Sequence, residues 1–143
     1  MMKLKRSDIF NNHFQHTMRK LTGYPTFPIK LAYSINRISD KVQSEINNSR
    51  TVIIGELKKH VVLNEDGTFK LLDAKDPGSY EFKDEAAKDA FNKQEAEFMA
   101  GEVEIEWKQL SIVELDGAGF KASATELNSI LPIISMGELE VAK

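Results

Sequence analysis

The feature that most constrains this chain is a long stripe of apolar and small residues between positions 28 and 60, a segment with no internal proline. The members of the stripe recur in steps of three and four: Ile35, Ile38, Val42, Ile46, Ser49, Ile53 and Leu57. These steps follow an eleven-residue period of about 3.67 residues per turn, which predicts one nearly straight helix. Such a helix would be roughly 45–50 Å long, so we expect it to need a partner helix. Gly55 is its weak point, at a cost of about 1 kcal/mol relative to alanine.

The partner helix is predicted in the segment KDEAAKDAFNKQEAEFMAG, with Asp84 as its cap and Gly101 as its stop. This helix is acidic where the first is basic, so an antiparallel pair would match in charge as well as in apolar stripes. Residues 61–82, which separate the two helices, contain β-prone runs around the turn NEDG, where Gly67 can adopt a positive φ. We therefore expect a small β element in this segment.

Three further elements flank the pair. The segment SDIFNNHFQHTMRKLTGY predicts one helix that starts at a cap on Ser7 or Asp8 and stops at Gly23, before the turn PTFP. Residues 102–115 read as a strand region. The segment SATELNSILPII predicts a short helix, because Ser123 and Glu126 have the spacing of a capping box. The tail SMGELEVAK is expected to fray or to be held by a partner.

Together these elements predict an α+β fold that is mainly helical: a long antiparallel helical hairpin, a small β region and a short C-terminal helix. The length of 143 residues suits a single domain, 1–143. Within it, 1–27 form the N-terminal helix and proline-containing turn, 28–100 the hairpin with its inserted β/turn segment, and 101–143 the strand region and last helix. The predicted core consists of Phe10, Phe14, Leu31, Ile35, Ile38, Val42, Ile46, Ile53, Leu57, Phe91, Phe98, Val103, Ile105, Trp107, Leu127 and Leu131.

Charge is distributed unevenly along the sequence. The net charge is −3, but residues 1–60 carry 11 Lys/Arg and four Asp/Glu, whereas residues 61–143 carry eight Lys/Arg and 18 Asp/Glu. Such asymmetry can mark a nucleic-acid-binding half, or a basic half that packs against an acidic half of the same chain or of a neighbour. We favour self-pairing, because no aromatic residues interleave with the basic ones. The chain has no cysteine, no apolar run long enough to span a membrane and no apolar stretch behind its basic start, so neither a membrane protein nor a signal peptide is expected.

No motif in the sequence points to catalysis, a cofactor or a metal. NEDG resembles the start of a calcium loop, but the residues that follow lack its ligand spacing. His13 and His16 have a metal-binding spacing on a helix without an accompanying carboxylate, and His60 stands alone near a helix end. Phosphate-binding glycine loops and nucleophile elbows are missing from the sequence. We therefore predict no catalytic, cofactor-binding or metal-binding residues, and a protein that is not an enzyme.

The stretch EVEIEW, residues 102–107, alternates glutamate with apolar residues. In a strand, Glu102, Glu104 and Glu106 would share one face while Val103, Ile105 and Trp107 face the core. Catalytic carboxylates need a cleft and a second group opposite them, and the sequence identifies neither. The glutamates are therefore interpreted as a solvated strand face, and an acidic surface for a partner is the main alternative.

An ordered set of segments resembles a known group. The first segment of the set is FPIKLAYSINRISDKVQSEI, and a long charged helix comes next. The turn NEDG and a Y-x-F motif follow, and then an acidic helix. The last segments are EVEIEW with LSIVEL, and SATELNSILP. In this order the segments resemble small uncharacterised proteins encoded by tailed bacteriophages and prophages. The resemblance implies a phage origin and a role in virion assembly or in contact with a host protein, and it transfers no catalytic residues.

The leading hypothesis is a non-enzymatic phage protein that binds protein, as a minor virion structural or assembly component in the host cytoplasm or the virion. Its partners would be other phage proteins, a host protein or further copies of itself as a homo-oligomer; no cofactor and no membrane are expected. A second hypothesis is an early factor that inhibits a host defence or nucleic-acid enzyme through its acidic face, and a third is nucleic-acid binding by residues 1–60. The candidate partner-binding residues are Arg37, Lys41, Arg50, Lys58, Lys59, Glu95, Glu102, Glu104 and Glu106.

Overall fold

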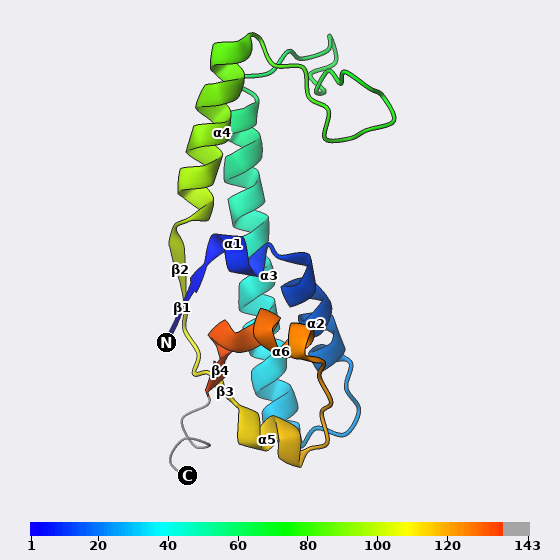
Figure 1. Cartoon of the computed structure of the whole chain (residues 1–143), viewed down its shortest axis with the longest axis vertical. Coiled ribbons are helices and arrows are strands. Elements are labelled where there is room, and N and C mark those ends of the chain that lie inside the picture. Colours follow the sequence, from blue (N-terminus) through cyan, green and yellow to red (C-terminus); the bar gives the residue numbers. More distant parts are fainter. Residues whose placement is uncertain (136–143) are drawn as a thin grey trace. The chain divides into compact units, whose positions relative to one another are not determined.

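The computed structural model describes residues 1–135 (Figure 1). Internal contacts divide the chain into two compact units, one formed by Met1–Ile46 with Ala100–Lys143 and the other by Asn47–Met99. Within residues 1–135 the fold is mainly helical α+β, as predicted, with six α-helices and four short strands. The tail for which fraying was predicted lies, apart from Ser135, outside the described residues.

The longest element is helix α3, Ile29–Leu57, which agrees with the predicted helix from 28 to 60. Its eleven-residue stripe is the buried side. Ile38 has no exposed surface, and Ile35 and Ile46 are nearly as enclosed in the first unit. Ser49 and Leu57 continue the buried side within the second unit. The apolar period read from the sequence therefore identifies the packed face of this helix.

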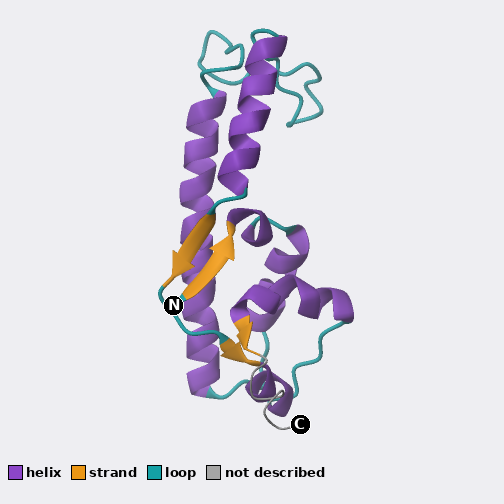
Figure 2. Ribbon diagram, turned by 60° about the vertical axis from the view of Figure 1, so that its left-hand side comes forward, coloured by secondary structure: helices purple, strands orange, loops and turns teal. Residues whose placement is uncertain are grey.

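Strands β1 and β2 form an antiparallel pair in the first unit (Figure 2). Strand β2, Glu102–Ile105, confirms the predicted alternation, with Val103 and Ile105 buried and the glutamates exposed. Its partner β1, Met2–Lys5, was not predicted, although MKLK has the same alternation of buried and exposed residues. The register places Lys3 opposite Glu104 and Lys5 opposite Glu102. Each glutamate of the strand therefore faces a lysine across the ladder.

The prediction of one continuous N-terminal helix was wrong. The structure has two helices, α1 at Arg6–Ile9 and α2 at Asn12–Thr22. The side chain of Asn11 accepts hydrogen bonds from the amides of His13 at 2.8 Å and Phe14 at 3.4 Å, so the cap lies at Asn11 and not at Ser7 or Asp8. Gly23 ends α2 as predicted.

The region after β2 also differs from the prediction. Only Leu110–Ser111 forms a strand, β3, which pairs in parallel with β4, Ile134–Ser135. Ile112–Gly117 is a helix, α5, because the Ser111 hydroxyl caps it by accepting the Glu114 amide at 3.3 Å. The last helix, α6, spans Ala124–Ile130 and has the predicted capping box of Ser123 and Glu126. A short 3-10 turn, Leu131–Ile133, follows it.

The core of the first unit joins α2, α3, the β1–β2 pair and the C-terminal elements. Leu131 was predicted to be buried but is 43% exposed, because the chain turns there into the 3-10 segment. Trp107 was also placed in the core, yet it is only partly buried at the margin. Phe10, Phe98, Ile53 and Leu127 are likewise only half-buried. Core residues not predicted are Met2, Leu4, Ile9, Met18, Leu21, Leu110, Leu115, Phe120, Ile130, Ile133 and Ile134.

In the second unit, α4, Glu85–Met99, lies beside the last part of α3 in both Figures 1 and 2. Leu57, Val61 and Phe91 form its buried cluster. Asp84 caps α4 as predicted, because its Oδ1 accepts the Ala87 amide at 2.7 Å. The segment 61–82 contains three isolated antiparallel bridges, and Gly67 adopts a φ of 83° in the NEDG turn. A small β element is therefore present where it was predicted.

Candidate functional site on helix α3 and strand β2

The most distinctive surface of the first unit surrounds Trp107, the one tryptophan of the chain. Strand β2 ends at Ile105 because the chain turns there, with the Trp107 amide donating to the Ile105 carbonyl at 2.8 Å. The indole then meets two side chains of α3. The Tyr33 ring lies edge-on at 6.0 Å between centroids, and the guanidinium carbon of Arg37 is 5.9 Å from the indole centroid. Trp107 therefore links β2 to the outer side of α3.

A shallow polar hollow continues this surface. It has a volume of about 320 Å³, and its lining includes Lys41 and Glu45 from α3 together with Glu104 and Glu106 from the β2 segment. Lys41 follows Arg37 by one helical turn, and Arg37 follows Tyr33 by the same step, so the three share one side of α3. We call the set Tyr33, Arg37, Lys41, Glu104, Glu106 and Trp107 the α3–β2 surface.

Two polar atoms beneath the aromatic cluster have no hydrogen-bond partner in the described chain. They are Nε of Arg37 and Nε1 of Trp107, and both are enclosed. An enclosed donor without an acceptor costs about 1–3 kcal/mol, and native proteins carry few of them. Both atoms can only donate, so they match an acceptor, not another donor.

The α3–β2 surface contains four of the nine residues proposed from the sequence: Arg37, Lys41, Glu104 and Glu106. Glu102 lies on the same exposed strand face as Glu104 and is opposite Lys5. Tyr33 and Trp107 were not proposed as surface residues. The sequence could have identified Tyr33 as a surface residue, because its spacing to Arg37 and Lys41 places it off the apolar stripe. For Trp107 the alternation of EVEIEW pointed to the core, and only the turn after Ile105 corrects it.

The other four proposed residues, Arg50, Lys58, Lys59 and Glu95, belong to the second unit. Lys59 Nζ donates to Oε2 of Glu56 at 3.1 Å, and this hydrogen bond is the main cause that lowers the pKa of the Glu56 carboxyl. His60 Nε2 lies 3.5 Å from the other oxygen of the same carboxylate. Glu95 lies at a groove of about 330 Å³ whose lining is otherwise largely apolar. The groove is lined by Val52, Ile53, Glu56, Phe91, Gln94, Glu95 and Phe98.

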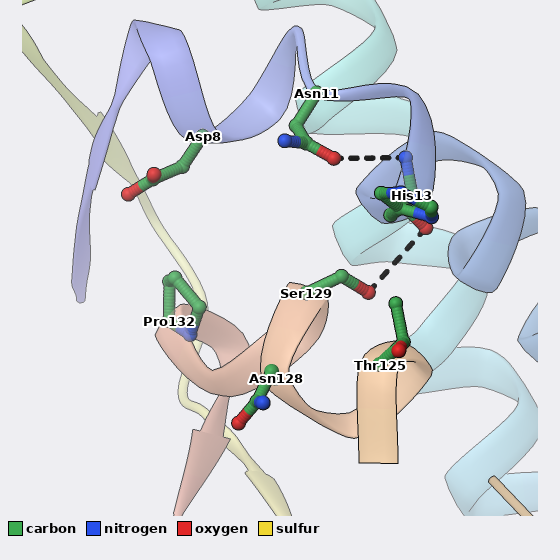
Figure 3. Close-up of a pocket in the computed structure, with 7 residues that line it drawn as sticks. All are labelled: Asp8, Asn11, His13, Thr125, Asn128, Ser129 and Pro132. Carbon is green, nitrogen blue, oxygen red and sulfur yellow. Dashed lines mark hydrogen bonds between the residues drawn. The ribbon is translucent and has the colours of Figure 1, made fainter. Parts of the chain in front are cut away.

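A second polar hollow of about 320 Å³ lies between the α1–α2 junction and α6 (Figure 3). It brings Ser129 near His13, and serine and histidine are the residue types that pair in many hydrolase active sites. The Ser129 hydroxyl, however, lies 2.6 Å from the Glu126 carbonyl, 3.1 Å from the Thr17 hydroxyl and 3.4 Å from the carbonyl of His13. The imidazole is not its partner, so this arrangement lacks the serine–histidine hydrogen bond of an activated nucleophile.

Among residues 1–135, no cluster of three or more histidine and carboxylate side chains has a geometry that could hold a metal ion. In the same part of the chain, no helix combines the length and the apolar character required to cross a membrane.

Comparison with known proteins yields no match: no family model fits the chain, and neither curated proteins nor solved structures give a significant similarity.

Proposed function

We propose that this protein acts by binding another protein, as a minor structural or assembly component of a tailed bacteriophage. The phage origin in this proposal rests on the resemblance of the ordered sequence segments. The protein has no catalytic role in it and works in the host cytoplasm or within the virion. The α3–β2 surface is the binding surface.

The observation that carries the proposal is the packing of Tyr33 and Arg37 against Trp107. Tryptophan, tyrosine and arginine are the residue types most enriched where alanine substitution weakens a protein interface strongly. Tyr33 is 58% exposed although it contacts the indole, and Ile29, two turns of α3 from Arg37, is 89% exposed. Large apolar side chains grouped at a polar margin are typical of a binding surface.

We also propose that the chain forms the long antiparallel helical hairpin predicted from its sequence. Its support lies within the second unit, where Leu57 and the half-buried Ile53 of α3 pack in one cluster with Phe91 of α4. A paired helical segment would give an assembly protein a stiff element to present to neighbours.

The two alternatives have less support. An inhibitor that mimics nucleic acid would need a strongly negative strand face, but Lys3 and Lys5 stand opposite Glu104 and Glu102. Nucleic-acid binding by residues 1–60 would need free cations, yet Lys20 is paired with Glu126 at 3.0 Å. Part of the charge asymmetry is thus satisfied within the chain.

The test is site-specific photocrosslinking during infection. A photoreactive amino acid replaces Tyr33, and in a matched control it replaces Leu72, which is 75% exposed in the second unit. Virions and assembly intermediates are then purified and analysed by mass spectrometry. We expect the position-33 variant to crosslink to a structural protein of the particle and the position-72 variant not to do so. Absence of the protein from particles and intermediates, with no crosslink at position 33, would refute the proposal.

A further inference from the structure

One edge of strand β2 is unpaired. The Arg6 amide donates to the Gly101 carbonyl at 3.0 Å, one step beyond the register pair of Lys5 and Glu102. In an antiparallel ladder, hydrogen-bonded pairs alternate with pairs whose amides and carbonyls point outward. The backbone groups of Glu102 and Glu104 therefore point away from β1.

Those outward groups have no partner of their own. Within the described chain, no other segment forms a hydrogen bond with the amide or the carbonyl of Glu102 or Glu104. Both residues are exposed. A row of unpaired amides and carbonyls is a template onto which another extended chain can pair.

Space for an added strand lies at the same place. The hollow of about 320 Å³ is lined by Lys41, Ser44 and Glu45 of α3 on one side and by residues 104–106 on the other. Side chains of a strand alternate between its two faces. An added strand would thus direct one set of side chains beside Glu102 and Glu104 and the other set toward the hollow.

The charge pattern selects the kind of strand that fits. On its paired edge, β2 already accepts β1, whose Lys3 and Lys5 stand opposite Glu104 and Glu102. A second copy of β2 would instead place glutamate opposite glutamate, and like charges directly opposite each other destabilise a pair. The glutamates therefore oppose self-association through this edge and favour a strand with lysine or arginine at alternate positions.

We infer that β2 accepts an additional antiparallel strand from a protein partner, and that the partner carries Lys or Arg at the two positions opposite Glu102 and Glu104. This inference rests on the proposed function, because the edge adjoins the α3–β2 surface. Backbone pairing supplies the attachment, and the alternating cations supply the selectivity.

The probe is the synthetic peptide acetyl-Thr-Val-Lys-Val-Lys-Val-Thr-amide, added to the full chain and followed by two-dimensional NMR. In the added strand, the amides of the two lysines would bond to β2, whereas those of the intervening valines would point away. We expect shifts centred on the amides of Glu102 and Glu104, and binding about tenfold weaker when the lysines are replaced by glutamate. Methylation of the lysine backbone nitrogens should also weaken binding about tenfold, whereas methylation of the valine nitrogens should leave it nearly unchanged.

A protein variant provides the reciprocal test. Glu104→Pro removes the carboxylate and an amide that points away from β1, so the β1–β2 ladder keeps its hydrogen bonds. Glu104→Gln removes the charge and keeps the amide. We expect Glu104→Pro to abolish peptide binding and Glu104→Gln to weaken it, with the NMR spectrum of the core unchanged in both.

No shift at Glu102 and Glu104 with about 5 mM peptide, enough to occupy most of a site with a Kd of about 1 mM, would overturn the inference. Equal losses from lysine and valine methylation would overturn it as well. A crosslink from position 33 to a particle protein would, in that case, leave the proposed function standing. Peptide binding without such a crosslink would support the strand edge and count against the virion role.

Discussion

Lys20 of α2 and Glu126 of α6 form an ion pair, with 3.0 Å between Nζ and Oε1. The same oxygen accepts the Ser123 amide at 2.9 Å, so one carboxylate caps α6 and also ties it to α2. The Ser123 amide, followed by Lys20, lowers the pKa of Glu126 below its ordinary value of 4.5. A carboxyl group whose pKa is lower in the folded chain stabilises the fold above the unfolded pKa and loses that effect as the pH falls.

The first prediction concerns Glu126→Gln. Glutamine keeps an acceptor for Ser123 but removes the negative charge beside Lys20, so we expect lower stability at pH 7. The difference from the natural chain should shrink below pH 4.5 and vanish once Glu126 is protonated in the folded state. Urea unfolding followed by circular dichroism at several pH values measures it. An equal loss at pH 3 and pH 7 would show that the charge is not responsible.

The second prediction concerns the strand pair. Lys3→Glu places two glutamates opposite each other, because Lys3 pairs in register with Glu104. We expect a loss of about 0.2–1 kcal/mol, and a similar loss for Glu104→Lys. The double exchange, Lys3→Glu with Glu104→Lys, should restore most of the stability, and the coupling should weaken in about 1 M salt. Additive losses in the double variant would mean that the two charges do not interact.

The third prediction compares two glycines of the second unit. A methyl group at Gly55 on α3 meets nothing within 4 Å, so Gly55→Ala should stabilise the chain by about 0.5–1 kcal/mol. Gly67 also has open space, but its φ of +83° is strained for any other residue. Gly67→Ala should therefore destabilise by about 1–2 kcal/mol. Thermal unfolding of both variants checks the opposite signs, and a shared sign would contradict the backbone explanation.

The fourth prediction tests the stripe of α3. Ile38 has no exposed surface, whereas Ile54, on the same helix, is 44% exposed. Ile38→Val should cost about 0.5–1.5 kcal/mol through the lost methylene and the cavity it leaves. Ile54→Val makes the same chemical change and should cost much less. Comparable losses in urea unfolding would indicate that Ile54 is covered in solution.

Local signals in the sequence were reliable where one segment decides its own structure. The period of α3, the Asp84 cap and the capping box of Ser123 and Glu126 each act within a few residues, and each appears in the structure. The alternation of β2 was readable for the same reason. These features depend on helix or strand geometry alone.

The errors arose where two local signals competed. Asn11, Ser7 and Asp8 are all good caps, and the apolar spacing continues across the break, so one helix was predicted in place of α1 and α2. Ile112 and Val113 favour strands, but the Ser111 cap starts α5 at that point. In both cases a side-chain cap decided between alternatives that a single sequence leaves nearly equal.

The candidate site could be predicted only in part. The charged residues of α3 and β2 were visible as separate patterns, but their joining depends on contacts between positions far apart in the chain. Trp107 reaches Tyr33 and Arg37 only because the chain turns after Ile105. The pairing of β1 with β2 likewise joins segments roughly a hundred residues apart. The residue pattern within one segment cannot predict a contact with a segment so distant in the sequence.

The distance in sequence between β1 and β2 has a consequence for synthesis on the ribosome. Strand β1 emerges first, and its partner is translated roughly a hundred residues later. At roughly 5–20 residues per second, β1 waits roughly 5–20 s for the strand that completes it. During that interval its lysines have no glutamates opposite them, and the nascent chain presents an unmatched basic strand to whatever acidic partner lies within reach.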